Sequence, residues 1–296
     1  MSESHLQSEK HLTIRGKRRK IPLQLMLLRI LFKYPGKILP RLMAAYAYRL
    51  WFRTYRHTPP QRETNLLRKS AFHTVKSGRH VIRVYTWGSG PIILLVHGWN
   101  GRGCQLGQFV EPLLQQGYRV VSFDAPGHGN STGDATTLFE IADALHAVAR
   151  WFGPVENIIA HSFGVTVSAY AIRHGLDVSN LVAISPPATI NGLLDKFSRA
   201  LGLPVTVQRL LRDKFEKDFG NTIWQTASTA EIVKTLSVPG LIVHDQQDYD
   251  VPWQEAKTIH DNWRDSELYL TSQLGHRRIL RSQNVIQRIV NYIDTR

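Results

Sequence analysis

The sequence predicts an α/β fold, with a mostly parallel central sheet, helices on both faces, a helical cap insertion and a basic helical N-terminal arm. Two observations predict it. Between residues 80 and 187, short apolar runs typical of strands buried on both faces alternate with segments of helical spacing. Each apolar run also ends in polar, small or glycine-rich residues, as expected where a parallel sheet places a ligand site at its carboxyl edge.

In the first half of the predicted sheet, strands and helices alternate regularly along the sequence. The spacing predicts strands over 80–87, 91–99, 118–129, 155–162 and 181–187, the last stopped by two prolines. Helices are predicted over 104–117, 136–153 and 163–174, with Thr136 or Thr137 as the N-cap of the second. Strands that alternate with helices indicate parallel pairing through crossover connections.

The alternation pauses after residue 187. Two helical stripes, 190–202 and 207–219, follow each other without a strand between them, which predicts a cap over about 188–235. Strands resume at 239–245 and 267–271, and a final helix is expected over about 277–293 with Ile279, Ile286, Ile289, Val290 and Ile293 facing inward. Residues 73–296 are therefore expected to form one domain, preceded by an arm over 1–72.

Positive charge is concentrated in this arm. Of the net charge of +14, residues 1–70 supply sixteen Lys and Arg against three Glu, whereas the remainder is almost balanced. After the basic cluster "RGKRRK" at 15–20, two short amphipathic helices are expected over 21–33 and 37–56, separated by a break at "YPG", 34–36. Neither segment has an uncharged run long enough to span a bilayer.

Three roles for the arm stay open. Its apolar faces could pack on the body, with the arginines toward water. Residues 15–56 could instead attach the protein to an anionic membrane surface, because aromatics beside arginines suit the headgroup zone. A protein or nucleic acid partner is a third interpretation, with nucleic acid the least favoured because the body is nearly neutral. With Cys104 as the only cysteine, no internal disulfide can form, and we expect a cytoplasmic protein, peripheral at the inner membrane surface if the arm binds lipid.

A nucleophile is suggested by "AHSFG" at 160–164, where Ser162 lies between a predicted strand and a predicted helix. Such a turn needs small residues two positions before and after the serine, and these are Ala160 and Gly164. A serine nucleophile also needs a base and an orienting acid. His276 follows the last strand, and the preceding strand ends in "HDQQDYDVP" with three aspartates, Asp245, Asp248 and Asp250.

Five motifs in order make the sequence resemble an α/β-hydrolase over roughly 75–296: "HGWNG" (97–101), "GHGNS" (127–131), "AHSFG" (160–164), "DQQDYDVP" (245–252) and "GH" (275–276). The resemblance implies Ser162 as nucleophile, His276 as general base and Asp248 as the orienting acid, with Asp250 as the alternative. It also implies an oxyanion hole from the backbone N–H groups of Trp99 and Phe163. It implies no cofactor and no metal.

The expected function is that of a serine hydrolase acting on a carboxylic ester or thioester, with lipid-like acyl substrates suggested by the apolar cap. The alternative is a non-catalytic binding or membrane-adaptor protein on the same fold. Five nearby residues receive lesser roles. His97, His128 and His161 are expected to support loops, and Asp124 to cap one. Arg102 could meet an anionic substrate or simply face the surface.

Overall fold

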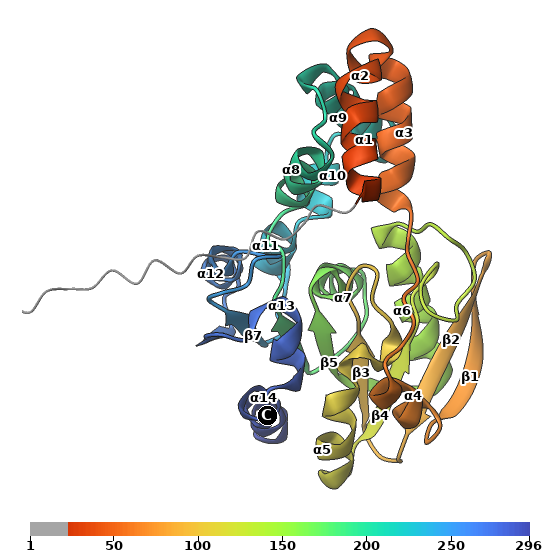
Figure 1. Ribbon diagram of the computed structural model, residues 1–296. Helices are drawn as coiled ribbons and strands as arrows, with labels where there is room; N and C mark the ends of the chain where they lie inside the picture. The colour runs from red at the N-terminus through yellow and green to blue at the C-terminus, as the bar shows by residue number, and fades with distance from the viewer. Residues whose placement is uncertain (1–22) are drawn as a thin grey trace, which may run out of the picture.

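The computed structural model describes residues 23–296 and contains an eight-stranded sheet (Figure 1). The basic cluster at 15–20 lies outside the described residues. The strand order is β1-β2-β4-β3-β5-β6-β7-β8, and all pairs from β4 onward are parallel, while β2 is antiparallel to β1 and β4. The strands are β1 Ala71–Ser77, β2 His80–Trp87, β3 Ile92–Val96, β4 Arg119–Phe123, β5 Val155–His161, β6 Asn180–Ile184, β7 Gly240–Asp245 and β8 Ser266–Thr271. The predicted mostly parallel α/β sheet is confirmed.

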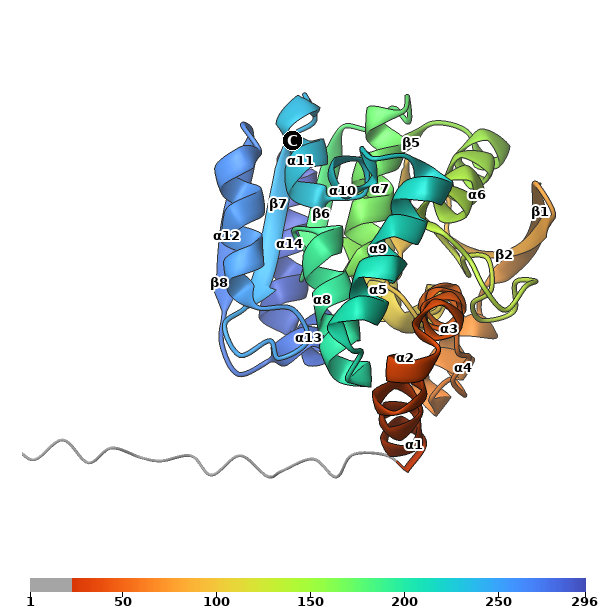
Figure 2. The ribbon, with the colours of Figure 1, turned by 90° about the horizontal axis from the view of Figure 1, so that it is seen from above.

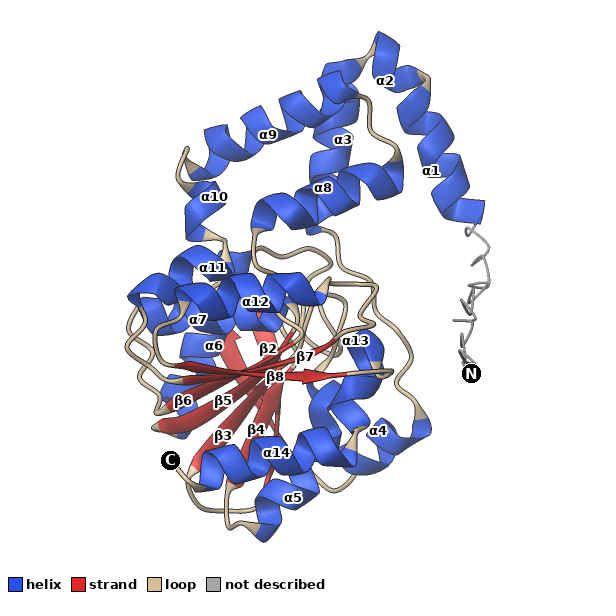
Figure 3. Cartoon of the chain, turned by 90° about the vertical axis from the view of Figure 1, so that its left-hand side faces the viewer, coloured by secondary structure: helices blue, strands red, loops and turns tan. Residues whose placement is uncertain are grey.

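Helices cover both faces of the sheet, as Figure 3 shows. One face carries α6 (Leu138–Phe152), α7 (Phe163–Arg173), α11 (Thr229–Ile232) and α12 (Trp253–Asn262). The other carries the 3-10 turn η1 (Gly103–Phe109), α5 (Val110–Gln115) and α14 (Gln283–Asp294). Apolar side chains from β3 to β7 point alternately into the two cores, which explains why these strands read as continuous apolar runs.

Thr137 is the N-cap of α6, one of the two candidates. Its hydroxyl accepts the backbone N–H of Glu140 at 3.1 Å, and the Glu140 carboxylate accepts the backbone N–H of Thr137 at 3.1 Å. This reciprocal pair is a capping box, which satisfies two N–H groups that the helix itself cannot use. It fixes the start of α6 beside the glycine-rich loop that follows β4.

A helical lobe rises above the carboxyl edge of the sheet (Figures 1 and 2). We define it as α1 (Leu23–Lys33), α2 (Pro35–Ile38) and α3 (Pro40–Phe52) together with α8 (Ile190–Leu201), α9 (Val205–Phe219) and α10 (Ile223–Thr226). The two cap helices expected at 190–202 and 207–219 are thus present as α8 and α9. N-terminal and cap helices share one apolar cluster, in which Phe32 and Ala47 meet Leu194, Val207 and Leu211.

The N-terminal helices correct two expectations. The first is the length of the break: α1 ends at Lys33, where the break was predicted, but only Tyr34 separates it from α2, which begins at Pro35, and a second interruption follows at Leu39, before Pro40. Proline is tolerated at a helix start, where its missing N–H has no partner in any case. The second is the extent of the second helix, because it ends at Phe52 rather than at 56. The boundary at residue 72 stays a prediction.

The segment after α3, residues 53–60, forms a strap along the body. Arg56 donates to the carbonyls of Gly129, Ser131 and Gly133 at 2.7–2.8 Å, and the Thr54 hydroxyl donates to the carbonyl of Gly127 at 2.8 Å. The strap thus pins the glycine-rich loop after β4. It leads to α4 (Gln61–Leu67), a helix that the sequence analysis did not predict.

Two other differences lie at the sheet edge and the C-terminus. Strand β1 and helix α12 were not predicted. The expected final helix is divided into α13 (Gly275–Arg278), the 3-10 turn η3 (Ile279–Arg281) and α14, and its five predicted inward side chains are all buried. None of the helices between residues 23 and 296 is long and apolar enough to cross a membrane.

Candidate active site

Ser162 occupies a sharp turn between β5 and α7, at the carboxyl edge of the sheet. Its backbone has φ 55° and ψ −128°, a conformation that non-glycine residues rarely adopt. The turn requires close packing. A Cβ added to Gly164 would lie 2.6 Å from the carbonyl oxygen of His97, and one added to Gly98 would lie 2.8 Å from the Cβ of Ser162. Ala160 is buried within the sheet, where its methyl group is accommodated.

The histidine expected as base lies next to this serine. Nε2 of His276 is 3.1 Å from the Ser162 hydroxyl oxygen, and its Nδ1 is 2.7 Å from the carboxylate of Asp248. The three side chains come from the turn after β5, the loop after β7 and the start of α13. The structure therefore brings Ser162, His276 and Asp248 into one hydrogen-bonded chain.

Asp248 is held as an ionised, buried acceptor. Its Oδ1 accepts the backbone N–H groups of Asp250 and Val251 at 2.8 and 2.9 Å, and its Oδ2 faces His244 at 3.4 Å. Burial tends to raise the pKa of Asp248, but hydrogen bonds from His244 and His276 and the charge of His276 hold the net pKa well below its usual range. Asp250 is exposed, so only Asp248 faces His276.

Asp245 organises the loop that carries His276. Its buried carboxylate accepts the backbone N–H groups of Gln247, Leu274 and Gly275 at 2.9–3.0 Å and the Thr271 hydroxyl at 2.9 Å. Burial raises its pKa, but these hydrogen bonds outweigh that effect, and the net pKa is lowered. Asp245 thus ties the loop after β7 to the loop after β8.

Trp99 and Phe163, the residues expected to form the oxyanion hole, line the same cavity as Ser162, and their ring centroids are 5.6 Å apart. Among the described residues neither backbone N–H donates to a protein acceptor. The loop that carries Trp99 is held by two neutral histidines. His97 accepts the N–H of Ala125 at 3.0 Å, and His128 accepts the N–H of Asn100 at 3.0 Å. Burial lowers the pKa of His97 to about 4 and that of His128 to about 3, so both rings keep an acceptor nitrogen at neutral pH.

His161 supports the loop that carries His276, in line with the loop-supporting role expected of it, although the sequence did not indicate which loop. Its ring lies against that of His276, with centroids 4.7 Å apart, and its Nε2 is 2.9 Å from the carbonyl oxygen of His276. Burial, followed by the neighbouring His276, lowers the pKa of His161 to about 3. A neutral His161 donates to that carbonyl and holds the backbone of His276. Only its position directly before Ser162 could have indicated this.

Two cavities meet at Ser162. The first, about 410 Å³, is mostly apolar, and the cap supplies Leu193, Phe197 and Ala200 while α3 supplies Leu50 and Trp51. The second, about 870 Å³, is more polar and is lined by His276, His161 and several arginines. Trp99 and Ser162 line both. The serine hydroxyl is therefore open to an apolar and a polar space.

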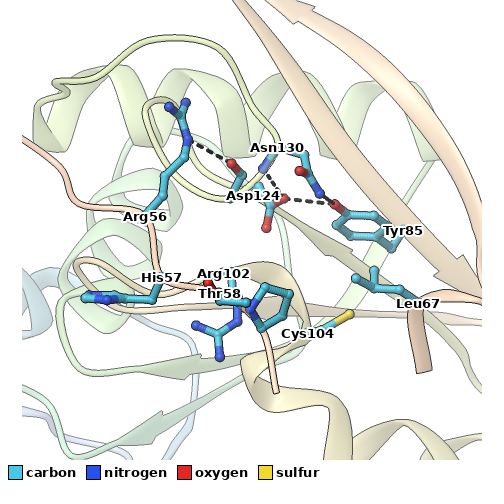
Figure 4. Close-up of a pocket in the computed structure, with 11 residues that line it drawn as sticks. Arg56, His57, Thr58, Leu67, Tyr85, Arg102, Cys104, Asp124 and Asn130 are labelled. Atoms are coloured by element: carbon cyan, nitrogen blue, oxygen red, sulfur yellow. Dashed lines mark hydrogen bonds between the residues drawn. The ribbon is translucent and has the colours of Figure 1, made fainter. Parts of the chain in front are cut away.

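A third cavity, about 340 Å³, adjoins the polar one (Figure 4). Asp124 points into it, with its carboxylate engaged by the N–H groups of Gly103 and Asn130 and by the Tyr85 hydroxyl at 2.7–2.9 Å. This agrees with its predicted role in the loop. Cys104 is buried, and burial raises the pKa of its thiol, so its place at the start of η1 does not activate it.

Arg102 is not free for a substrate. It donates to both oxygens of the buried Glu63 carboxylate, at 2.5 and 3.0 Å. This ion pair fixes α4 against the loop before η1. No group of three or more His, Cys, Asp or Glu side chains within residues 23–296 is arranged to hold a metal ion.

Comparison with known proteins identifies relatives. A family described as the alpha/beta hydrolase family matches residues 93–286. Proline iminopeptidase of Pestalotiopsis fici is 23% identical over 69% of this chain and 92% of that protein. Lysophosphatidylserine lipase of Danio rerio is 29% identical over 58% of this chain, and the match spans about half (47%) of the lipase. Pimeloyl-[acyl-carrier protein] methyl ester esterase of Vibrio vulnificus is 32% identical over 47% of this chain and 52% of the esterase.

Solved structures share the fold. A putative lipase from Acinetobacter baumannii superposes with a TM-score of 0.61 at 20% identity, covering 79% of this chain and 95% of the lipase. An esterase from Exiguobacterium antarcticum gives a TM-score of 0.59 at 19% identity, covering 75% of this chain and 99% of the esterase.

Proposed function

Because this chain is an enzyme of the alpha/beta hydrolase family, we propose that it is a serine hydrolase that cleaves a carboxylic ester or thioester through an acyl-enzyme on Ser162. The observation that carries the proposal is the hydrogen-bonded chain Ser162–His276–Asp248, with distances of 3.1 and 2.7 Å. A nucleophile, a base in reach of it and an acid that orients the base are the groups that this chemistry needs.

In the proposed mechanism, His276 takes the proton of Ser162 as its oxygen attacks the substrate carbonyl. The N–H groups of Trp99 and Phe163 stabilise the oxyanion of the tetrahedral intermediate, an effect worth about 3 kcal/mol for one donor in a comparable enzyme. His276 then protonates the leaving alcohol or thiol, leaving the acyl group on Ser162. A water molecule, deprotonated by His276, releases the acid and restores the serine.

The proposed substrates carry an acyl chain. The apolar cavity beside Ser162 is lined by Leu50, Trp51, Leu193, Phe197 and Ala200, which offer an acyl chain an apolar surface, while Arg53 and Lys196 are the charged residues in its lining. Lipases and esterases among the relatives and structural neighbours agree with such a substrate class.

A fluorophosphonate probe tests the proposal directly. We expect covalent labelling of the native protein at Ser162, and no labelling of Ser162→Ala. A panel of p-nitrophenyl esters and acyl thioesters of increasing chain length should be hydrolysed by the native protein only. A native protein that is neither labelled nor active on any member of the panel would be a binding or adaptor protein, and the proposal would be wrong.

We also propose that α1, α2 and α3 dock the enzyme on an anionic membrane surface. Of the fifteen exposed large apolar side chains within residues 23–296, seven lie on these helices and two more, Tyr34 and Leu39, lie in the links between them. The seven are Leu23, Met26, Leu27, Ile30, Leu31, Ile38 and Leu42. Those in α1 recur every three or four residues and so form a stripe on one side of the helix. The opposite side of α1 is buried through Phe32 in the lobe.

The positive charge of the surrounding sequence favours an anionic membrane as the partner of this apolar stripe. Between residues 11 and 61 the sequence contains no Asp or Glu, but many Lys and Arg, among them Lys33 and Lys37 beside the stripe. An apolar face flanked only by cations is what an interfacial helix on anionic lipid requires. Helix α3 also carries Leu50 and Trp51 into the cavity beside Ser162, so the lobe would bring that cavity close to the lipid surface.

Flotation with vesicles tests this part separately. We expect the full chain to float with phosphatidylglycerol-rich vesicles and less with phosphatidylcholine alone, with binding weakened by salt. Substituting Leu27, Ile30 and Ile38 by Gln should abolish flotation. Substituting the equally exposed Phe72 and Trp151, which lie far from the lobe on β1 and α6, should not. A native protein left in the soluble fraction with anionic vesicles would contradict membrane docking.

A further inference from the structure

The direction in which the leaving group departs follows from the two cavities at Ser162. Nε2 of His276, the nitrogen that would protonate the leaving group, is 3.1 Å from the serine oxygen. His276 lines the polar cavity and does not line the apolar one. The leaving alcohol or thiol must therefore lie in the polar cavity, with the acyl chain on the apolar side.

The polar cavity has an excess of positive charge. Two carboxylate residues line it, Glu63 and Asp250, against five cationic residues: Arg62, Arg102, Lys196, Arg277 and Arg281. The cations come from α4, from the loop before η1, from the cap helix α8, and from α13 and η3. Segments far apart in the sequence thus converge on one space.

Three of these cations, Lys196, Arg277 and Arg281, have no carboxylate partner among the described residues. The Glu63 carboxylate is occupied by Arg102 and lies 3.7 Å from Arg62. Lys196 donates to the backbone carbonyl of Asp250. Within residues 23–296, neither Arg277 nor Arg281 forms an ion pair. Arg277 directly follows His276 in α13 and lines the same cavity.

We propose that this cavity is a subsite for a leaving group that bears a phosphate. The inference rests on the proposed function and specifies the substrate of the same site. Ser162 Oγ forms its bond to the acyl carbon, the bond from that carbon to the leaving oxygen or sulfur breaks, and His276 supplies the proton. The phosphate takes no part in the bond changes. It is held by Arg277 and Arg281, whose guanidinium groups suit phosphate oxygens.

Two sources share this chemistry: the headgroup of a lysophospholipid, and the phosphopantetheine arm of a coenzyme A or carrier-protein thioester. Two pairs of substrates, all with the same short acyl chain, distinguish the two sources. The first pair is lysophosphatidylglycerol, which carries a single acyl chain, and neutral monoacylglycerol. The second is acyl-coenzyme A and the neutral acyl-N-acetylcysteamine thioester. We measure kcat/KM for each below its micellar concentration.

The native enzyme should favour the phosphate-bearing member of at least one pair by about tenfold or more, the scale of one or two charge-assisted hydrogen bonds. The pair that shows the preference identifies the source. Raising ionic strength should reduce the preference. In the double variant Arg277→Gln/Arg281→Gln, the ratio within that pair should fall by about tenfold. Arg173→Gln, which removes an exposed cation at the end of α7, should leave the ratio unchanged.

Equal kcat/KM values within both pairs, or a ratio that the double variant does not change, would overturn the inference. Either result leaves the proposed function intact if the neutral members are hydrolysed and Ser162→Ala is inactive. Hydrolysis that persists in Ser162→Ala would instead overturn the proposed function itself.

Discussion

The carboxylate of Asp248 and Nδ1 of His276 meet at 2.7 Å, although the two residues are 28 positions apart and leave the sheet from neighbouring strands. The contact depends on Asp245, whose carboxylate binds backbone N–H groups in both loops. One aspartate thus fixes the loops, and another faces the histidine.

This geometry predicts different outcomes for two neighbouring substitutions. Asp248→Asn should lower kcat by about 10⁴, because an amide cannot hold His276 in the tautomer that leaves Nε2 free to accept a proton. Asp250→Asn should change kcat little, because that side chain is exposed and only its backbone N–H contacts Asp248. Steady-state hydrolysis of a short chromogenic ester measures both, and thermal unfolding verifies that both variants fold. Equal losses in the two variants would contradict the assignment.

The residues at strand ends were accessible to prediction because strand and helix periodicity places them at one edge of the sheet. The segments after β5, β7 and β8 carry Ser162, Asp248 and His276, respectively. This order can be predicted from the sequence alone. The periodicity of 190–202 and 207–219 likewise predicted the cap. Each of these inferences uses only local pattern and the rule that parallel strands share a carboxyl edge.

What could not be predicted depends on long-range packing. An apolar helix face predicts burial but not the element against which it packs. The packing of α1 and α3 against α8 and α9 could therefore not be predicted from the sequence. Strand β1 is an edge strand with few buried side chains, and it therefore lacks the apolar run that marks the others. The role of His161 depends on the backbone of His276, 115 positions away.

The turn at Ser162 predicts opposite outcomes for two small residues beside it. Gly164→Ala should destabilise the fold by several kcal/mol and remove activity, because the added Cβ would lie 2.6–2.7 Å from the backbone oxygens of His97 and Val96. Ala160→Gly should retain activity and cost only about 0.5–1 kcal/mol, the usual penalty for glycine in a strand. Urea unfolding and ester hydrolysis report on both. Normal stability of Gly164→Ala would show that the strand and helix can separate there.

The far wall of the apolar cavity predicts a change in chain-length preference. Trp51 packs edge-on against Phe197 and Phe215, with ring centroids 5.3 and 5.8 Å apart. It also borders a small apolar cavity lined by Phe139, Phe219 and Ile223. Trp51→Ala should join the two spaces and shift the optimum on an ester panel toward longer chains. Trp151→Ala, an exposed tryptophan on α6, is the control. An unchanged optimum in Trp51→Ala would place the acyl chain elsewhere.

Three buried histidines predict a loss of stability in mildly acidic solution. The folded-state pKa values of His97, His128 and His161 are lowered to about 4, 3 and 3, mainly by burial. In the unfolded chain these rings take up protons near pH 6.5, whereas the folded protein keeps them neutral until the pH approaches 4. The free energy of unfolding should therefore decrease as the pH falls from about 6.5 to 4, by up to about 1.4 kcal/mol per pH unit for each histidine. Asp245 and Asp248, whose pKa values are also lowered, add their own loss only below about pH 4, where carboxylates of the unfolded chain become protonated.

A single variant isolates one of these contributions. His128→Gln removes a titrating ring but keeps a side-chain oxygen that can accept the backbone N–H of Asn100. Its free energy of unfolding, measured by urea denaturation at intervals between pH 7.5 and 4.5, should fall with a shallower slope than that of the native protein. Because one of the three buried rings with pKa values of about 3 to 4 is gone, the part of the slope that these rings contribute between pH 6 and 5 should decrease by about a third. If the free energy of unfolding of the native protein does not change across this pH range, the three rings titrate in the folded protein as they do in the unfolded chain. The hydrogen bonds from the N–H groups of Ala125 and Asn100 to neutral imidazole would then not form.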